Sequence, residues 1–234
     1  MLTPEEQSAL WLSFKVAGIA TLASLLPGIF LGWLLAKREF VGKAVLDAVV
    51  HLPMVLPPVV PGYLLLLAFG SQGPVGRWLA DCCGVSFSFN WLGAALASAV
   101  MGFPLLVQSV RLSMQLVDAR LENAARTLGA SPLMLFASVT LPLALPGILV
   151  GALLTFSRSL GEFGATITFV GNIEGETRTL PLAIYSAVQR IDGEPMAMRL
   201  ILISLMLAFA SLLIGNYLSR RAAQRLGQGH HAEL

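Results

Sequence analysis

Arg158 and Glu162 are the two residues whose types and spacing point most directly to chemistry. They lie four positions apart, at the end of an apolar stretch over residues 139–160. Side chains at this spacing share one face of a helix and can form an ion pair. An ionisable group at membrane depth is costly, so it is a functional candidate by default. We expect the pair to fix the outer end of this helix or to help close an external gate; a purely structural ion pair is the alternative.

A polar stretch over residues 122–142, ENAARTLGASPLMLFASVTLP, lies between strongly apolar segments and is typical of a docking surface. Residues 121–128 contain neither Gly nor Pro and predict a short helix. Gly129 can adopt the positive φ that ends a helix. Ser131-Pro132 is typical of an N-cap followed by the first position of the next helix. We expect a helix, a sharp turn and a second helix, which another protein can approach closely. An ordinary basic loop between two membrane spans is the alternative.

The residues needed by an intramembrane enzyme are absent from the sequence. It has no HExxH motif and no Ser/His arrangement in an apolar stretch, and Asp47, Asp118 and Glu122 lie at the ends of such stretches. It also has no G-x4-GK[ST] motif, so ATP must be hydrolysed by a partner. Cys82 and Cys83 are adjacent, which is not a metal-ligand spacing, and we expect two unpaired thiols and no metal site. A passive channel is a further alternative, but it would not need a docking segment.

The composition indicates a chain that lipid surrounds. Of its 234 residues, 56% are hydrophobic and only 12% are charged, and the mean hydropathy is +0.77. Soluble domains carry about 25% charged residues. The net charge of +2 makes nucleic acid an unexpected partner. Glu5 and Glu6 precede the first apolar run in place of a basic segment, which favours a retained membrane span over a cleaved signal peptide.

The apolar segments predict an all-α polytopic membrane protein with about five transmembrane helices. A helical span needs about 20 mostly apolar residues, and proline is tolerated there when neighbours satisfy the freed carbonyls. The second span contains Pro53, Pro57, Pro58 and Pro61, which must kink or break it. This kink is either a flexible segment facing a pathway or a packing feature. The predicted spans are residues 11–36, 46–69, 91–112, 139–160 and 198–218.

The distribution of basic residues predicts the orientation. With the N-terminus outside and five spans, the main Lys and Arg clusters all face the cytoplasm, as the positive-inside rule requires. The C-terminus then lies inside. These clusters are Lys37, Arg38 and Lys43; Arg111, Arg120 and Arg126; and Arg220, Arg221 and Arg225.

We expect one transmembrane domain over residues 11–218, with a cytoplasmic loop at 120–138 and a short cytoplasmic tail at 219–234. Residues 161–196 form a long mixed segment that we interpret as external or partly re-entrant. Its apolar part, residues 180–188, is too short to span a bilayer. A tilted sixth helix in this region is the alternative, and it would place the C-terminus outside.

The polar stretch resembles the cytoplasmic coupling loop of ABC importer permeases, E-A-A-x3-G-x9-I-x-L-P. The two alanines, Gly129, Leu141 and Pro142 match it, and Val139 replaces the Ile. Asn123 stands in the place of the acidic residue, and Glu122 lies one position earlier. The resemblance implies a type I ABC importer permease fold, in which this loop sits in a cleft of a nucleotide-binding subunit. The implied coupling residues are Glu122, Asn123, Ala124, Ala125, Gly129, Ala130 and Ser131.

The stretch from Arg158 to Ala165, RSLGEFGA, resembles the R-x-x-G-E-F-G-A sequence of oxyanion permeases. Its continuation through TITFVGN and GETRTLPLAIY is most similar to molybdate permeases, as are residues 51–67 and 37–47. Together these segments cover most of the chain from about residue 11 to residue 220. The resemblance implies import of molybdate by alternating access; sulfate or tungstate is the alternative.

An oxyanion pathway would need hydrogen-bond donors and a positive potential, which helix starts and hydroxyl groups supply. Ser159, Thr166 and Thr168 are candidate lining residues beside Arg158 and Glu162. The alternative is that these hydroxyls bond their own backbone. A carboxylate repels a divalent anion, so we expect Glu162 to pair with Arg158 and not with the substrate.

The resemblance also implies the partners and the location. They are a second copy of the chain, two cytoplasmic subunits that bind ATP and Mg²⁺, and an external molybdate-binding protein. The chain would lie in the bacterial cytoplasmic membrane, would carry no cofactor of its own and would not itself be an enzyme.

Overall fold

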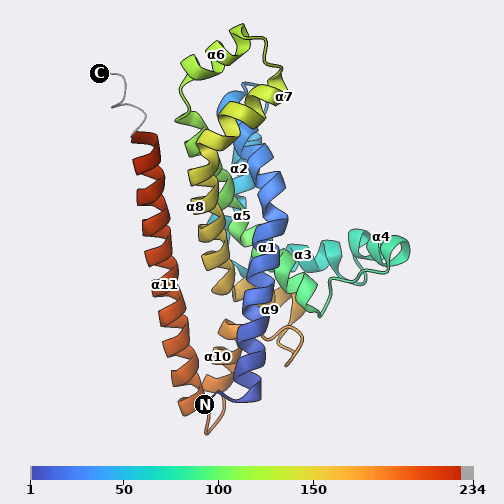
Figure 1. Ribbon diagram of the computed structural model, residues 1–234. Coiled ribbons are helices and arrows are strands. Elements are labelled where there is room, and N and C mark those ends of the chain that lie inside the picture. Colours follow the sequence, from blue (N-terminus) through green and yellow to red (C-terminus); the bar gives the residue numbers. More distant parts are fainter. Residues whose placement is uncertain (1, 228–234) are drawn as a thin grey trace.

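The computed structural model describes residues 2–227, and every regular element in this range is helical (Figure 1). This confirms the predicted all-α class. The elements are α1 (Pro4–Lys37), α2 (Lys43–Val55), α3 (Val59–Phe69), α4 (Pro74–Cys83), α5 (Trp91–Gln115), α6 (Ala119–Thr127), α7 (Pro132–Leu135), the π-helical turn η1 (Phe136–Thr140), α8 (Leu141–Leu160), α9 (Gly164–Val170), α10 (Leu180–Val188) and α11 (Glu194–Gly227).

Helix α1 begins before its apolar run because a capping box fixes its start. The Thr3 side chain accepts from the Glu6 backbone N–H at 3.3 Å, and the Glu6 carboxylate accepts from the Thr3 N–H at 2.6 Å. Such reciprocal bonds satisfy two of the free donors at a helix start. The span expected from residue 11 therefore starts at Pro4.

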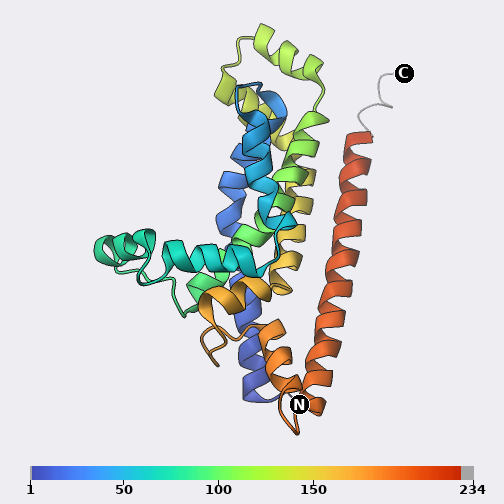
Figure 2. The same cartoon turned by 180° about the vertical axis from the view of Figure 1, so that it is seen from behind.

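The second predicted span, residues 46–69, is broken at its prolines, which is one of the two outcomes that they predict. The chain bends by 113° between α2 and α3. Leu56 is extended (ψ 145°), as residues before proline usually are. Pro57 and Pro58 supply no N–H to continue the α2 ladder. As a result α3 runs outward from the bundle and leads to α4, which lies away from the other helices (Figure 2).

Helix α5 lies at the centre of the bundle between α1 and α8. Small residues allow the α1 contact: a Cβ on Gly28 would come within 2.5 Å of Leu106, and one on Gly32 within 2.5 Å of Val110. Both α5 side chains are fully buried. The core of the molecule therefore runs along α5.

The segment after α8 does not cross the bundle again. Helix α10 has the predicted bounds and only nine residues, and α11 starts at the end of the molecule that also holds the start of α1 (Figure 1). Four helices of the described chain are long and apolar enough to cross a membrane, or five if α2 and α3 count as one span. This agrees with about five spans, and α10 is not a sixth span among the described residues.

The N-terminal end of α1 lies at one end of the molecule, and α6 lies at the other with the C-terminal end of α11 (Figure 1). The arrangement places the predicted coupling loop and the end of the last helix on the same side. Residues 219–227, expected to be tail, continue α11. The rest of that predicted tail, residues 228–234, lies outside the described residues.

Candidate functional site

The predicted helix, turn and helix are present at the α6 end. Asp118 caps α6 by accepting from the Arg120 N–H at 2.8 Å, a cap that our sequence reasoning did not assign. Gly129 has φ +85°, which confirms the left-handed turn. Ser131 caps α7 by accepting from the Met134 N–H at 3.3 Å, with Pro132 at the first position. We call α6, the Gly129 turn and α7 the coupling segment.

Large apolar side chains, more than the alanines, distinguish the outer face of the coupling segment. Leu128 is 88% exposed and Leu133 is 77% exposed, and Met134 is exposed beside them. Single exposed apolar residues are common, but a group of them in an otherwise polar segment is a candidate interaction surface. The sequence signal was the presence of Leu and Met within the polar stretch. Of the other predicted coupling residues, Asn123, Ala124, Gly129 and Ser131 are exposed, and Ala125 and Ala130 are half-buried.

Glu122 points into the protein and not toward this outer face. It is only 9% exposed. Its Oε1 lies 3.1 Å from Lys37 Nζ and accepts a 2.8 Å hydrogen bond from Thr140 Oγ1. The Lys37 ammonium also donates to the Val117 carbonyl at 3.5 Å. The shifted acidic residue thus ties α6 to the end of α1 and to η1.

The turn η1 connects the coupling segment to α8 without a break. Residues 132–160 together form one candidate membrane span, so the helix begins seven residues before the predicted start at residue 139. π-helical turns occur mostly as short insertions and often at functional sites. Thr140, the partner of Glu122, is the last residue of this turn.

The predicted pair of Arg158 and Glu162 is confirmed, with Arg158 Nη1 2.7 Å from Glu162 Oε2. Glu162 is 2% exposed, and its Oε1 also accepts from the Ala165 backbone N–H at 2.9 Å. The carboxylate therefore holds the end of α8 to the start of α9.

The three hydroxyl residues near this pair differ in their contacts. Thr168 donates to the carbonyl of Gly164, one turn earlier, at 2.8 Å, which is the backbone-bonding alternative. Ser159 donates to the Ser98 carbonyl on α5 at 3.4 Å. Thr166 is buried, and its Oγ1 has no hydrogen-bond partner. Of these three hydroxyls, the Thr166 hydroxyl is therefore the one that forms no hydrogen bond within the protein.

Helix α9 packs closely on α3, directly after the proline break. A Cβ on Gly62 would lie 2.7 Å from the Ala165 carbonyl oxygen, and one on Gly164 would lie 2.6 Å from Pro58 Cβ. The structure therefore brings the Arg158–Glu162 pair and the proline cluster together through α9. The coupling segment lies at the other end of α8 (Figure 1).

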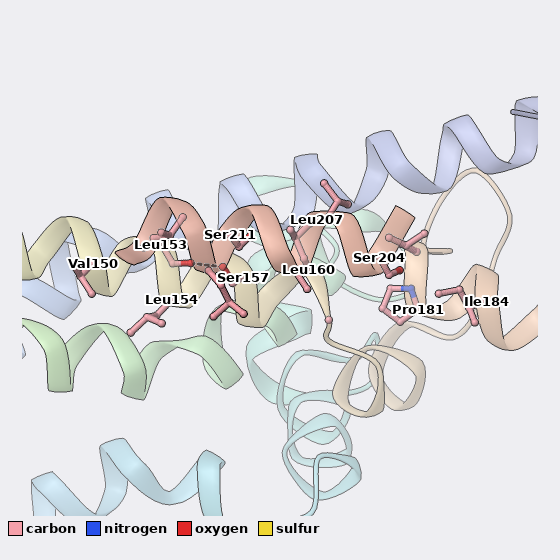
Figure 3. Close-up of a pocket in the computed structure, with 15 residues that line it drawn as sticks. Val150, Leu153, Leu154, Ser157, Leu160, Pro181, Ile184, Ser204, Leu207 and Ser211 are labelled. Atoms are coloured by element: carbon pink, nitrogen blue, oxygen red, sulfur yellow. Dashed lines mark hydrogen bonds between the residues drawn. The ribbon is translucent and has the colours of Figure 1, made fainter. Parts of the chain in front are cut away.

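An apolar cavity of about 600 Å³ lies between α8, α10 and α11, as shown in Figure 3. Leu153, Leu154 and Leu207 contribute much of its wall, and its polar residues include Ser157 and Ser211. The Ser157 hydroxyl already donates to the Leu153 carbonyl at 2.8 Å. No charged side chain lines this cavity, so it is unsuited to an oxyanion, which would be desolvated without compensation. Elsewhere, Cys82 and Cys83 are free and exposed, as expected.

Comparison with known proteins gives a consistent result. Residues 28–224 match the family described as "Binding-protein-dependent transport system inner membrane component". The chain is 55% identical over 228 residues to the molybdenum transport system permease protein ModB of Escherichia coli K12, covering 97% of this chain and 100% of that protein. It is 33% identical over 221 residues to the sulfate transport system permease protein CysT of the same strain, covering 93% and 79%.

Among solved structures, the fold is similar to that of a bacterial alginate ABC transporter crystallised with a periplasmic protein bound to an alginate pentasaccharide. The TM-score is 0.73 at 16% identity, covering 94% of this chain and 80% of the other. At this identity the likeness concerns the fold alone.

Proposed function

Because the chain belongs to the family of binding-protein-dependent transport system inner membrane components, we propose that it is the membrane subunit of an ATP-driven importer of molybdate. It is a multi-pass protein of the inner membrane. The observation that carries the proposal is the coupling segment at one end of the bundle, in a chain 55% identical to a molybdenum permease.

Two features support the proposed partners: the sequence has no Walker A motif, and the coupling segment exposes apolar side chains. Without this motif in the chain, separate subunits bind and hydrolyse ATP. The exposed Leu128 and Met134 suit burial in a cleft of such a subunit. A second copy of the chain completes the pathway, and an external binding protein delivers the anion. In this arrangement the α6 end faces the cytoplasm and the N-terminus lies outside, as the basic clusters favour.

Movement of the coupling segment reaches the membrane helices through two links. One is covalent, because α7 continues through η1 into α8. The other is the polar cluster of Lys37, Glu122 and Thr140, which fastens α6 to α1 and η1. Helices α1, α5 and α8 are packed together around the core. Closure of the ATP-binding subunits would therefore displace these helices as a rigid body, which is how alternating access is commonly produced.

At the other end of α8, the Arg158–Glu162 pair sets the position of α9 and hence of α3 at its proline break. We assign this region to the external gate. Glu162 acts there as a positioning residue: its two oxygens are engaged with Arg158 and Ala165. Thr166 is the candidate polar group of the pathway.

The substrate can be tested with the assembled transporter. We expect the molybdate-loaded binding protein to stimulate its ATP hydrolysis, and a sulfate-loaded binding protein not to do so. Stimulation by sulfate alone would contradict the choice of molybdate. Failure of the chain to co-purify with an ATP-binding subunit would contradict the permease assignment itself.

A further inference from the structure

An apolar groove runs along α1 toward the coupling segment. It encloses about 390 Å³ between the outer face of α1 and the α7–η1 turn. Its walls include Leu26, Ile29 and Phe30 on one side and Leu133 and Phe136 on the other. Leu26 and Phe30 lie one helical turn apart, so both contribute to the α1 wall of the groove.

A polar cavity of about 370 Å³ adjoins the groove, because both are lined by Trp33, Arg38 and Phe136. The polar cavity is bordered by three cationic side chains, Lys37, Arg38 and Arg126, and by the carboxylate of Glu122. Apolar walls thus lead directly into a group of positive charges at the end of α1.

Two of these cations are not neutralised. Lys37 pairs with Glu122 at 3.1 Å. Neither Arg38 nor Arg126 has a carboxylate within ion-pair distance in the described part of the chain. The Arg38 guanidinium lies over the Trp33 ring, 5.4 Å from its centroid, and the Trp33 ring meets Phe136 edge-on at 6.0 Å. The cavity therefore presents two uncompensated positive charges beside an aromatic wall.

We propose that this site binds an anionic phospholipid, with an acyl chain in the apolar groove and the headgroup phosphate between Arg38 and Arg126. Basic pockets at the membrane surface select anionic headgroups, and Trp is enriched at that level of the bilayer. A free oxyanion would use the two arginines but leave the apolar groove empty. The site is separate from the molybdate pathway and does not depend on which anion is transported.

The bound lipid would brace the coupling segment against α1. Leu133 and Phe136 belong to α7 and η1, whereas Leu26 and Phe30 belong to α1, so an acyl chain between them fills the gap across which α6 and α7 are joined to the bundle. We therefore expect the lipid to raise the rate of ATP-driven transport by keeping this connection rigid.

The test uses the assembled transporter, purified and exchanged into nanodiscs that contain either phosphatidylcholine alone or phosphatidylcholine with phosphatidylglycerol. Native mass spectrometry measures the phosphatidylglycerol retained by the complex. We expect the double variant Arg38→Ala/Arg126→Ala to lower this retention about tenfold. The variant Arg38→Lys/Arg126→Lys should keep most of it, because the charges remain.

Arg77→Ala is the matched control, since Arg77 is a cation on α4, far from the groove. It should retain as much phosphatidylglycerol as the unchanged chain. Co-purification of the ATP-binding subunit shows that each variant is folded. Equal retention by the Ala double variant and the unchanged chain would overturn the proposal. Displacement of the lipid by millimolar inorganic phosphate would also overturn it, because the site would then select the anion alone.

Discussion

The two ends of α8 differ in where their apolar and charged side chains lie. At the α6 end, apolar side chains face outward and the ion pair of Lys37 and Glu122 faces inward. Around α9, both the Arg158–Glu162 ion pair and the apolar contacts are internal. Glu162 is 2% exposed and contacts both Arg158 and the Ala165 backbone. Helix α9 packs so closely on α3 that a Cβ at Gly62 would clash with it. The coupling segment instead presents exposed Leu128 and Leu133. From this comparison we infer that the α6 end is a surface for another protein, whereas the contacts around α9 hold that helix in position. Substitutions near α9 should therefore affect stability most, and those at the coupling segment should affect transport most.

The largest effect on stability is expected from Arg158→Leu. It leaves the buried Glu162 carboxylate without its partner, which costs about 2 kcal/mol here because Arg158 is itself partly exposed. Thermal unfolding of the purified transporter measures the loss. The double variant Arg158→Leu/Glu162→Gln should recover most of it, since the amide oxygen still accepts from Ala165 and no charge is left unpaired. An unchanged melting temperature for Arg158→Leu would contradict the role given to this pair.

The next effect concerns the Gly129 turn. Gly129→Val places a β-branched residue at φ +85°, which costs about 1–2 kcal/mol, although no neighbouring atom obstructs the side chain. We expect the ATP-binding subunit to bind about tenfold more weakly and molybdate uptake to fall with it. Gly129→Asn is the control, because Asn tolerates this conformation. If the Val variant transports normally, the turn is not part of the docking geometry.

A smaller effect is expected from Thr140→Val, which removes the donor to Glu122 while keeping the shape of the side chain. A hydrogen bond to a charged group contributes about 1.5–3 kcal/mol, and we expect the lower value because Lys37 still pairs with Glu122. Transport per ATP hydrolysed should fall, and Thr140→Ser should restore it. Equal coupling ratios for the Val and Ser variants would show that this link transmits nothing.

The smallest change in stability is expected from Thr166→Val, since its buried hydroxyl has no partner to lose. If Thr166 serves the anion pathway, molybdate uptake falls while the melting temperature stays the same. Thr168→Val is the comparison, because that hydroxyl bonds its own helix and uptake should be kept. Normal uptake by both variants would remove the hydroxyls from the pathway.

Local rules allowed much of the coupling segment to be predicted from the sequence. Gly129 and Ser131-Pro132 act through their own backbone conformation, so their roles could be read directly. The pairing of Arg158 with Glu162 also depends only on helical spacing. The inward position of Glu122 could not be predicted, because Lys37 and Thr140 come from distant parts of the chain and meet it only in the folded bundle.

The prolines predict a kink or a break within residues 46–69, but the sequence does not predict its angle. Hydropathy measures how apolar a stretch is and not its direction, so residues 46–69 counted as one span. The observed bend of 113° is accompanied by close contacts of Gly62 and Pro58 with α9, which lies about a hundred residues later in the chain. The first and fourth spans start earlier than their apolar residues predict. A capping box sets the start of α1, and the π-helical turn η1 joins α7 to α8 in one continuous span.

The thirteen residues of α2 rise only about 20 Å, against a hydrocarbon layer of about 30 Å. A helix of this length that starts at the membrane surface ends inside the layer, where the carbonyls of Pro53 and Met54 would need N–H donors that Pro57 and Pro58 do not have. Lipid cannot satisfy them. We therefore expect a neighbouring protein surface to cover this gap, with the exposed Tyr63, Leu64 and Leu67 of α3 as candidate contacts. A copy that is not assembled with its partners would then expose unsatisfied backbone carbonyls to lipid and would be less stable in the bilayer than an assembled one.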